Sequence, residues 1–214
     1  MSCCRSGACE QMFSPRTARR SLERYRSKGL DEIERRIVAS AKETGIQGAR
    51  VLEIGGGIGV IQAELLQVGA ATGEIVELVV AYEPYARELA SDKGLSDRVT
   101  FRVVDLVEDP DDVEPADVVV LNRVVCCSPD GIELSGIAGR LARRTLVLSY
   151  PRDVVWVRLG VGLINLGQRL FRRSFRAFVH SPAKLCAAVE EQGLRATDLG
   201  RTAFWEYSTL ERAQ

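Results

Sequence analysis

The stretch that decides the fold is Val51-Leu52-Glu53-Ile54-Gly55-Gly56-Gly57-Ile58-Gly59. Its apolar start, residues 50–54, predicts a buried strand, and three glycines at alternate positions follow at once. Glycine allows a tight turn and lets a ligand approach the backbone without meeting a Cβ atom. Residues 60–68 then have a helical pattern. The stretch therefore predicts a strand, a glycine turn and a helix whose N-terminus faces a ligand.

Apolar runs and helical stretches alternate after this unit. Further strands are predicted at residues 74–80, 99–104, 116–121 and 145–149, with helices at residues 85–91 and 132–142. Strands separated by helices of this length are typical of βαβ units, and so of a parallel sheet with helices on both faces. In such a sheet the ligand crevice lies beyond the carboxyl ends of the strands, where the strand order reverses.

The two ends of the chain have different patterns. Residues 1–15 show no apolar period, and residues 15–44 predict a basic helical arm that Gly29 divides in two. A helix is expected at residues 154–170, and another from Pro182 to about residue 193, with Ser181 as its N-cap. Two strand-like runs, 195–199 and 203–210, predict a terminal antiparallel hairpin.

Together these patterns predict one domain of the α/β class. We expect a Rossmann-like, doubly wound fold with a seven-stranded, mostly parallel sheet, a C-terminal antiparallel hairpin and an N-terminal helical arm. Residues 1–44 form the Cys-bearing segment and the arm, and residues 45–212 form the ligand-binding domain.

Composition excludes several classes of protein. The chain has 214 residues, 46 % of them hydrophobic and 27 % charged, as in ordinary globular proteins. Its 29 Lys and Arg residues balance 29 Asp and Glu residues, which disfavours a nucleic-acid partner. The first 13 residues lack an apolar leader segment, and the six cysteines are expected as thiols. We therefore expect a cytoplasmic protein without a transmembrane segment.

The glycine turn indicates which kind of cofactor is bound. Dinucleotide sites read G-x-G-x-x-G, but here Gly55, Gly57 and Gly59 give G-x-G-x-G, and Val60 occupies the place of the third glycine. Glu53 also precedes the turn, where a carboxylate would repel a pyrophosphate and attract a cation. A cationic or zwitterionic cofactor is thus favoured over NAD.

In this respect the chain resembles the class I S-adenosylmethionine-dependent methyltransferases, whose first motif is hydrophobic-Leu-Glu/Asp-hydrophobic-Gly-x-Gly-x-Gly. Residues 51–59 match it at every position, and the resemblance extends over about residues 45–212. It implies that S-adenosylmethionine is the cofactor and that an acid at the end of the second strand holds the ribose hydroxyls. Glu77 and Glu83 compete for that role, and we choose Glu77 because its spacing from the turn suits it better. The cofactor residues expected are Glu53, Gly55, Gly57, Gly59, Glu77, Leu78, Asp105, Leu106 and Asn122.

The resemblance further implies a methyl transfer by in-line displacement, here to a small-molecule acceptor. No catalytic base is evident, and the candidates are Tyr25, Cys127 and His180, with a structural role favoured for His180. The Arg/Tyr-bearing arm and the loop around Cys127 are similar to the magnesium-protoporphyrin O-methyltransferase subgroup, although Cys127 stands where that subgroup carries a histidine. Two alternatives stay open: a non-catalytic S-adenosylmethionine-binding or assembly protein of this fold, and an NAD-type oxidoreductase.

Two further features are outside this scheme. Cys3, Cys4 and Cys9 offer three thiols, one fewer than a structural zinc site requires, so we expect no metal. Residues 154–178 carry apolar side chains suited to a lid or to ordinary packing, with arginines beside them that are also suited to peripheral contact with anionic lipid. The arginines concerned are Arg169, Arg172, Arg173 and Arg176. The sequence does not predict the acceptor or the oligomeric state.

Overall fold

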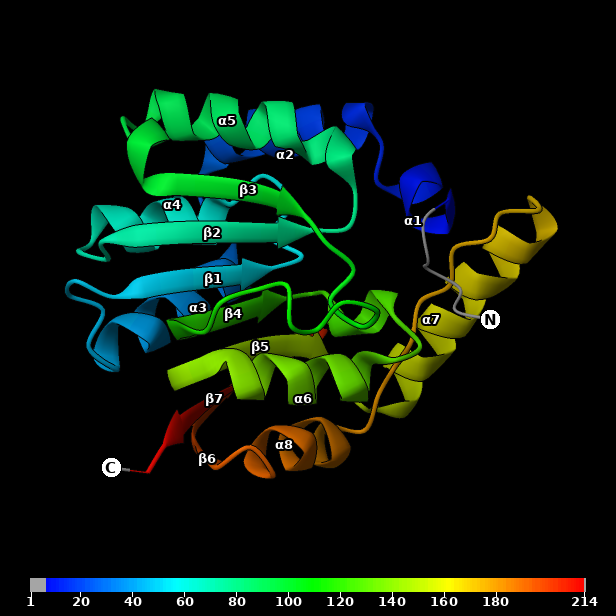
Figure 1. Ribbon diagram of the computed structural model, residues 1–214. Helices are drawn as coiled ribbons and strands as arrows, with labels where there is room; N and C mark the ends of the chain where they lie inside the picture. Colours follow the sequence, from blue (N-terminus) through cyan, green and yellow to red (C-terminus); the bar gives the residue numbers. More distant parts are fainter. Residues whose placement is uncertain (1–6, 214) are drawn as a thin grey trace.

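A computed structural model describes residues 7–213 as a seven-stranded sheet between two layers of helices (Figure 1). The strands are β1 (Arg50–Ile54), β2 (Thr72–Glu77), β3 (Val99–Val103), β4 (Ala116–Asn122), β5 (Ala142–Pro151), β6 (Leu194–Arg201) and β7 (Trp205–Arg212). The α-helices are α1 (Gly7–Met12), α2 (Pro15–Lys28), α3 (Glu32–Glu43), α4 (Val60–Gln67), α5 (Glu83–Asp92), α6 (Gly131–Leu141), α7 (Val155–Leu170) and α8 (Pro182–Glu190). Short 3-10 helices are η1 (Val80–Tyr82), η2 (Ser96–Arg98) and η3 (Val125–Cys127).

The strand order confirms the predicted doubly wound topology. It runs β3-β2-β1-β4-β5-β7-β6, and only the pairs β5–β7 and β7–β6 are antiparallel. The chain winds outward from β1 to β3, then returns to place β4 on the other side of β1. The crevice between the carboxyl ends of β1 and β4 is therefore the switch point at which this kind of sheet binds ligands.

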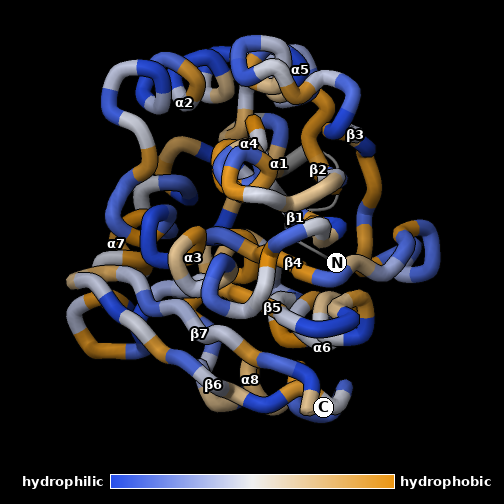
Figure 2. Tube along the Cα trace, turned by 90° about the vertical axis from the view of Figure 1, so that its left-hand side faces the viewer, coloured by the Kyte–Doolittle hydropathy of each residue, from blue (hydrophilic) through white to orange (hydrophobic). Residues whose placement is uncertain are grey.

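The sheet is apolar on both faces, because helices cover both. Along β4, Val118 and Val120 belong to the core on one face, while Val119 and Leu121 belong to the core on the other. The first core lies under α2 to α5 and the second under α6 and α8. Figure 2 shows α2 as alternating hydrophilic and hydrophobic stretches, as expected for a helix that buries one side.

Local chemistry sets the limits of the arm helices. Ser14 caps α2, and the chain leaves that helix at Gly29, whose φ is 67°. Asp31 and Glu34 form a reciprocal capping box at the start of α3. Residues of the arm, including Leu22 and Ile37, share one core with the sheet.

The structure differs from the prediction in three details. Residues 7–12 form the short helix α1, although no helix was expected before residue 15. The second strand ends at Glu77 rather than at Val80, because the Glu77 carboxylate accepts the amides of Leu78 and Val79 and turns the chain into η1. The side chain of Ser181, the expected N-cap of α8, makes no capping hydrogen bond, although α8 begins at Pro182 as predicted.

Candidate functional site

A cavity of about 340 Å³ lies at the carboxyl edge of the sheet, at the switch point. Its size falls within the range of small-molecule sites. Loops that follow four parallel strands supply its floor, and the N-terminal arm supplies part of its wall. Eight of the nine residues predicted for the cofactor line it: Glu53, Gly55, Gly57, Glu77, Leu78, Asp105, Leu106 and Asn122. The ninth, Gly59, lies just behind the turn as the N-cap of α4.

The glycine turn has the conformation that its residues predict. Gly55, Gly57 and Gly59 have φ values of 62°, 57° and 74°, in the left-handed region that side chains disfavour. Space matters as well: a Cβ at Gly55 would lie 2.5 Å from the Val124 side chain, and one at Gly59 would lie 2.4 Å from Ile75. The turn thus presents bare backbone to the cavity, as a ligand-binding cradle requires.

Glu53 is buried at the base of the turn, and its Oε2 accepts a hydrogen bond of 3.1 Å from the Gln62 amide in the first turn of α4. Burial raises the pKa of Glu53 to about 8, against the lowering effect of that hydrogen bond. The carboxyl group therefore already engages one of the amides at the N-terminus of α4, the kind of group that binds a pyrophosphate in a dinucleotide site.

Glu77 lies at the end of β2 and joins the turn to the cavity wall. Its Oε2 accepts from the Gly57 amide at 2.9 Å, and its Oε1 accepts from the amides of Leu78 at 2.9 Å and Val79 at 3.3 Å. Burial raises the pKa of Glu77, and the three amide hydrogen bonds oppose that rise. Its rival Glu83 is absent from the cavity lining and forms an ion pair with Arg87 on α5.

The loops after β3 and β4 supply the remaining predicted groups. Asp105 lines the cavity while its Oδ1 accepts from the Val107 amide at 3.1 Å, so it also shapes its own turn, and Leu106 is buried beside it. Asn122 Oδ1 accepts a hydrogen bond of 2.8 Å from the Ser149 hydroxyl. Ser149 Oγ in turn accepts one from the Arg123 backbone amide. Asn122 is thereby held in a fixed orientation at the edge of β4.

Arm residues that the sequence did not predict also line the cavity. Phe13, Arg24 and Glu34 line it together with Tyr82 from η1. Arg24 Nη2 reaches both oxygens of the buried Glu34 carboxylate, at 3.0 and 3.2 Å, which fixes α2 against α3. Burial and then the nearby Glu77 charge raise the pKa of Tyr82 to about 12, so its hydroxyl stays protonated. These four residues line the cavity only because segments distant in the sequence pack together, and the local sequence carries no signal for such packing.

The three catalytic candidates lie in different places. Cys127 lines the cavity, and its thiol donates to the Arg123 carbonyl at 3.6 Å. Tyr25 is absent from the lining, since its hydroxyl donates to Glu64 on α4, and burial raises its pKa. His180 is also absent from the lining; its Nε2 lies 3.0 Å from the Val125 carbonyl and 2.9 Å from the Ser128 carbonyl. Two carbonyl acceptors require a protonated Nε2, so His180 braces the loop after β4.

The cysteines of the N-terminal segment are only partly described. Cys3 and Cys4 lie outside the described residues, while Cys9 is buried in α1 and lines the cavity. Within residues 7–213, no three His, Cys, Asp or Glu side chains gather in a way that would hold a metal ion.

No protein-family model and no curated protein sequence matches this chain. Solved structures do match it. Magnesium protoporphyrin IX methyltransferase from Synechocystis PCC 6803 with bound S-adenosylhomocysteine has a TM-score of 0.71 at 18 % identity, over 96 % of this chain and 98 % of that one. An O-methyltransferase family 2 protein from Planctomyces limnophilus in complex with apigenin has a TM-score of 0.69 at 19 % identity, over 97 % of this chain and 66 % of that one.

A protein from Galdieria sulphuraria that has been assigned as a sarcosine dimethylglycine methyltransferase has a TM-score of 0.68 at 12 % identity, over 85 % of each chain. These proteins differ in the molecules they are named for and share the architecture. The chain therefore has the fold of the class I S-adenosylmethionine-dependent methyltransferases.

Proposed function

We propose that this protein binds S-adenosylmethionine and transfers its methyl group to a small-molecule acceptor. The observation that carries the proposal is that one cavity brings together eight of the nine residues expected to hold this cofactor, although they come from four separate loops. Two of the structures that share the fold were solved with this cofactor or its demethylated product.

The residues present fit the cofactor chemically. The cavity lining contains five acidic residues (Glu34, Glu53, Glu77, Asp105 and Asp130) and two basic ones, Arg24 and Arg123. Arg24 pairs with Glu34, and Glu53 can ionise when a cation lies beside it, so the acidic groups that remain suit a ligand with positive charge. The Glu77 carboxylate is oriented by three backbone amides and has the acceptor capacity to receive ribose hydroxyls. The bare turn at Gly57 allows the ligand to approach the backbone.

S-adenosylmethionine supplies an already activated methyl group, so the protein's task is to position and desolvate the acceptor. We assign positioning to Asn122, Cys127 and Tyr82, all of which line the cavity. Phe13 and Arg24 of the arm exclude water from the same space. Because neither Tyr25 nor His180 lines the cavity, the proposed reaction uses no general base from these two residues.

The fold alone does not separate an enzyme from a binding protein. Purified protein incubated with S-adenosylmethionine and a fractionated metabolite extract should form S-adenosylhomocysteine in some fractions. Glu77→Ala should abolish this turnover, and the matched variant Glu83→Ala, which changes a carboxylate outside the cavity lining, should retain it. Tight cofactor binding without turnover in any fraction would favour the non-catalytic alternative.

A further inference from the structure

Helix α7 exposes an apolar surface that the cavity does not use. Of the eleven large apolar side chains that are exposed among the described residues, eight fall between Val155 and Phe171. Six of them share one side of the helix, with exposed fractions between 52 and 74 %. We call these six the α7 stripe: Val155, Trp156, Leu159, Leu163, Leu166 and Leu170.

The α7 stripe lies opposite the face by which the helix packs on the protein. At about 100° per residue, its six side chains fall within an arc of roughly 100°, and the buried Val157, Val161 and Gln168 fall on the other side. The packed face is firmly held: Asn165 exchanges two hydrogen bonds of 2.8 Å with the backbone of Ala177. The stripe is therefore exposed even though the opposite face of α7 is packed on the protein.

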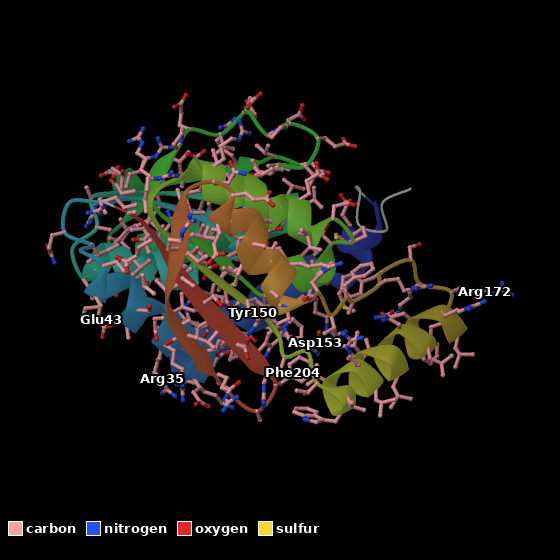
Figure 3. The ribbon with its side chains drawn as sticks, turned by 90° about the horizontal axis from the view of Figure 1, so that it is seen from below. Arg35, Glu43, Tyr150, Asp153, Arg172 and Phe204 are labelled. Atoms are coloured by element: carbon pink, nitrogen blue, oxygen red, sulfur yellow. The ribbon has the colours of Figure 1, made fainter. Side chains whose placement is uncertain are left out.

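Charge gathers next to the stripe with a single sign. Residues 154–189 contain six Lys or Arg and no Asp or Glu, in a chain that has 29 of each in total. Four of the six lie within eight residues of the chain, in the last turn of α7 and the segment that follows it, and we call them the arginine cluster: Arg169, Arg172, Arg173 and Arg176. Figure 3 shows α7 extending away from the body of the protein, with Arg172 at its far end and Asp153 near its base.

We propose that the α7 stripe and the arginine cluster dock this protein on an anionic lipid surface. Amphipathic helices that lie in the membrane interface combine a Trp- and Leu-rich face with basic residues beside it. The same surface of a second copy is a poor occupant, because residues 154–189 carry six Lys or Arg and no acid, and so offer no charge complementary to the arginine cluster.

Length and position favour a helix that lies on the bilayer. Helix α7 has 16 residues, about 24 Å, and none of the described helices has the length and apolar character to cross a membrane. It starts just after the carboxyl end of β5, and in Figure 1 it lies at the edge of the sheet toward which β1, β2 and β3 point. Docking would therefore turn the edge that holds the cavity toward the lipid. The docking itself does not depend on the proposed transfer reaction.

Flotation of the full chain with lipid vesicles tests the proposal. We expect partition into phosphatidylcholine vesicles that contain phosphatidylserine, weakening at high salt, and little partition into phosphatidylcholine alone. Arg172→Gln with Arg173→Gln should lower the partition coefficient roughly fivefold per arginine, on the order of 25-fold together. Leu159→Ser with Leu163→Ser should lower it about tenfold or more.

Matched controls change similar residues elsewhere. Leu199→Ser replaces an exposed leucine on β6, and Arg20→Gln with Arg143→Gln removes two exposed arginines, so both should bind like the wild type. Circular dichroism melts show whether each variant folds, and the arginine pair still tests the proposal if the leucine pair does not. Absence of wild-type partition, or partition that neither salt nor the arginine pair affects, would overturn it. So would a wild-type dimer that the leucine pair converts to a monomer without any vesicle binding.

Discussion

Replacement of Glu53 by glutamine should change how the stability of the ligand-free protein depends on pH. Burial raises the pKa of this carboxyl group from 4.5 to about 8. Between these values the folded protein retains a proton that the unfolded chain has lost, so the stabilising contribution is present at low pH and is lost as the pH rises toward 8. The free energy of unfolding should fall by up to about 1.4 kcal/mol per pH unit.

From pH 5.5 to 7.5 this amounts to about 2.5 kcal/mol for Glu53 alone. Glutamine does not titrate, and its amide oxygen can still accept from the Gln62 amide. Glu53→Gln should therefore match the wild type near pH 4, exceed it by about 1.4 kcal/mol at pH 5.5 and exceed it by about 4 kcal/mol at pH 7.5. Urea unfolding at intervals of pH, without ligand, measures the difference between the two proteins. Glu83→Gln controls for the removal of a carboxylate as such. A difference between Glu53→Gln and the wild type that stays constant across this window would refute the burial argument.

The remaining predictions concern the ligand and the candidate base. Calorimetry at pH 6.5 in buffers of different ionisation enthalpy should show about one proton released when S-adenosylmethionine binds, because its ammonium group favours ionised Glu53; zero release would contradict that pairing. Gly57 has a φ of 57°, and a Cβ atom there would lie 3.3 Å from the Tyr82 ring. Gly57→Val should therefore abolish binding, while the circular dichroism spectrum stays that of a folded protein. His180→Ala should cost about 1–3 kcal/mol in urea unfolding, by loss of the brace to Val125 and Ser128, and should leave the pH profile of turnover unchanged. A shifted profile would restore His180 as a base.

Elements with a local cause could be predicted from the sequence. The turn after β1 follows from glycines, which adopt its positive φ angles without steric cost, and the break after α2 follows from Gly29. The order of strands and helices follows from their apolar periods. In each case the information lies within a few residues of the feature itself.

Features that depend on distant contacts could not be predicted in this way. The apolar run after Glu77 reads as a continued strand, but the carboxylate of that residue ends it. Phe13 reaches the cavity only because the arm folds back over the sheet edge, which places its ring centroid 6.4 Å from that of Tyr82 in η1. Tyr25 is a catalytic candidate from its place on the arm, yet its hydroxyl donates to Glu64 on α4 and does not line the cavity.

Isothermal titration of the wild-type protein with S-adenosylmethionine, S-adenosylhomocysteine and NAD tests the central claim most directly. The account predicts one binding site that accepts the first two compounds and is weakened on the order of 100-fold by Glu77→Ala, through loss of two charge-assisted hydrogen bonds to the ribose. Binding of NAD with no response to either sulfur compound would contradict it.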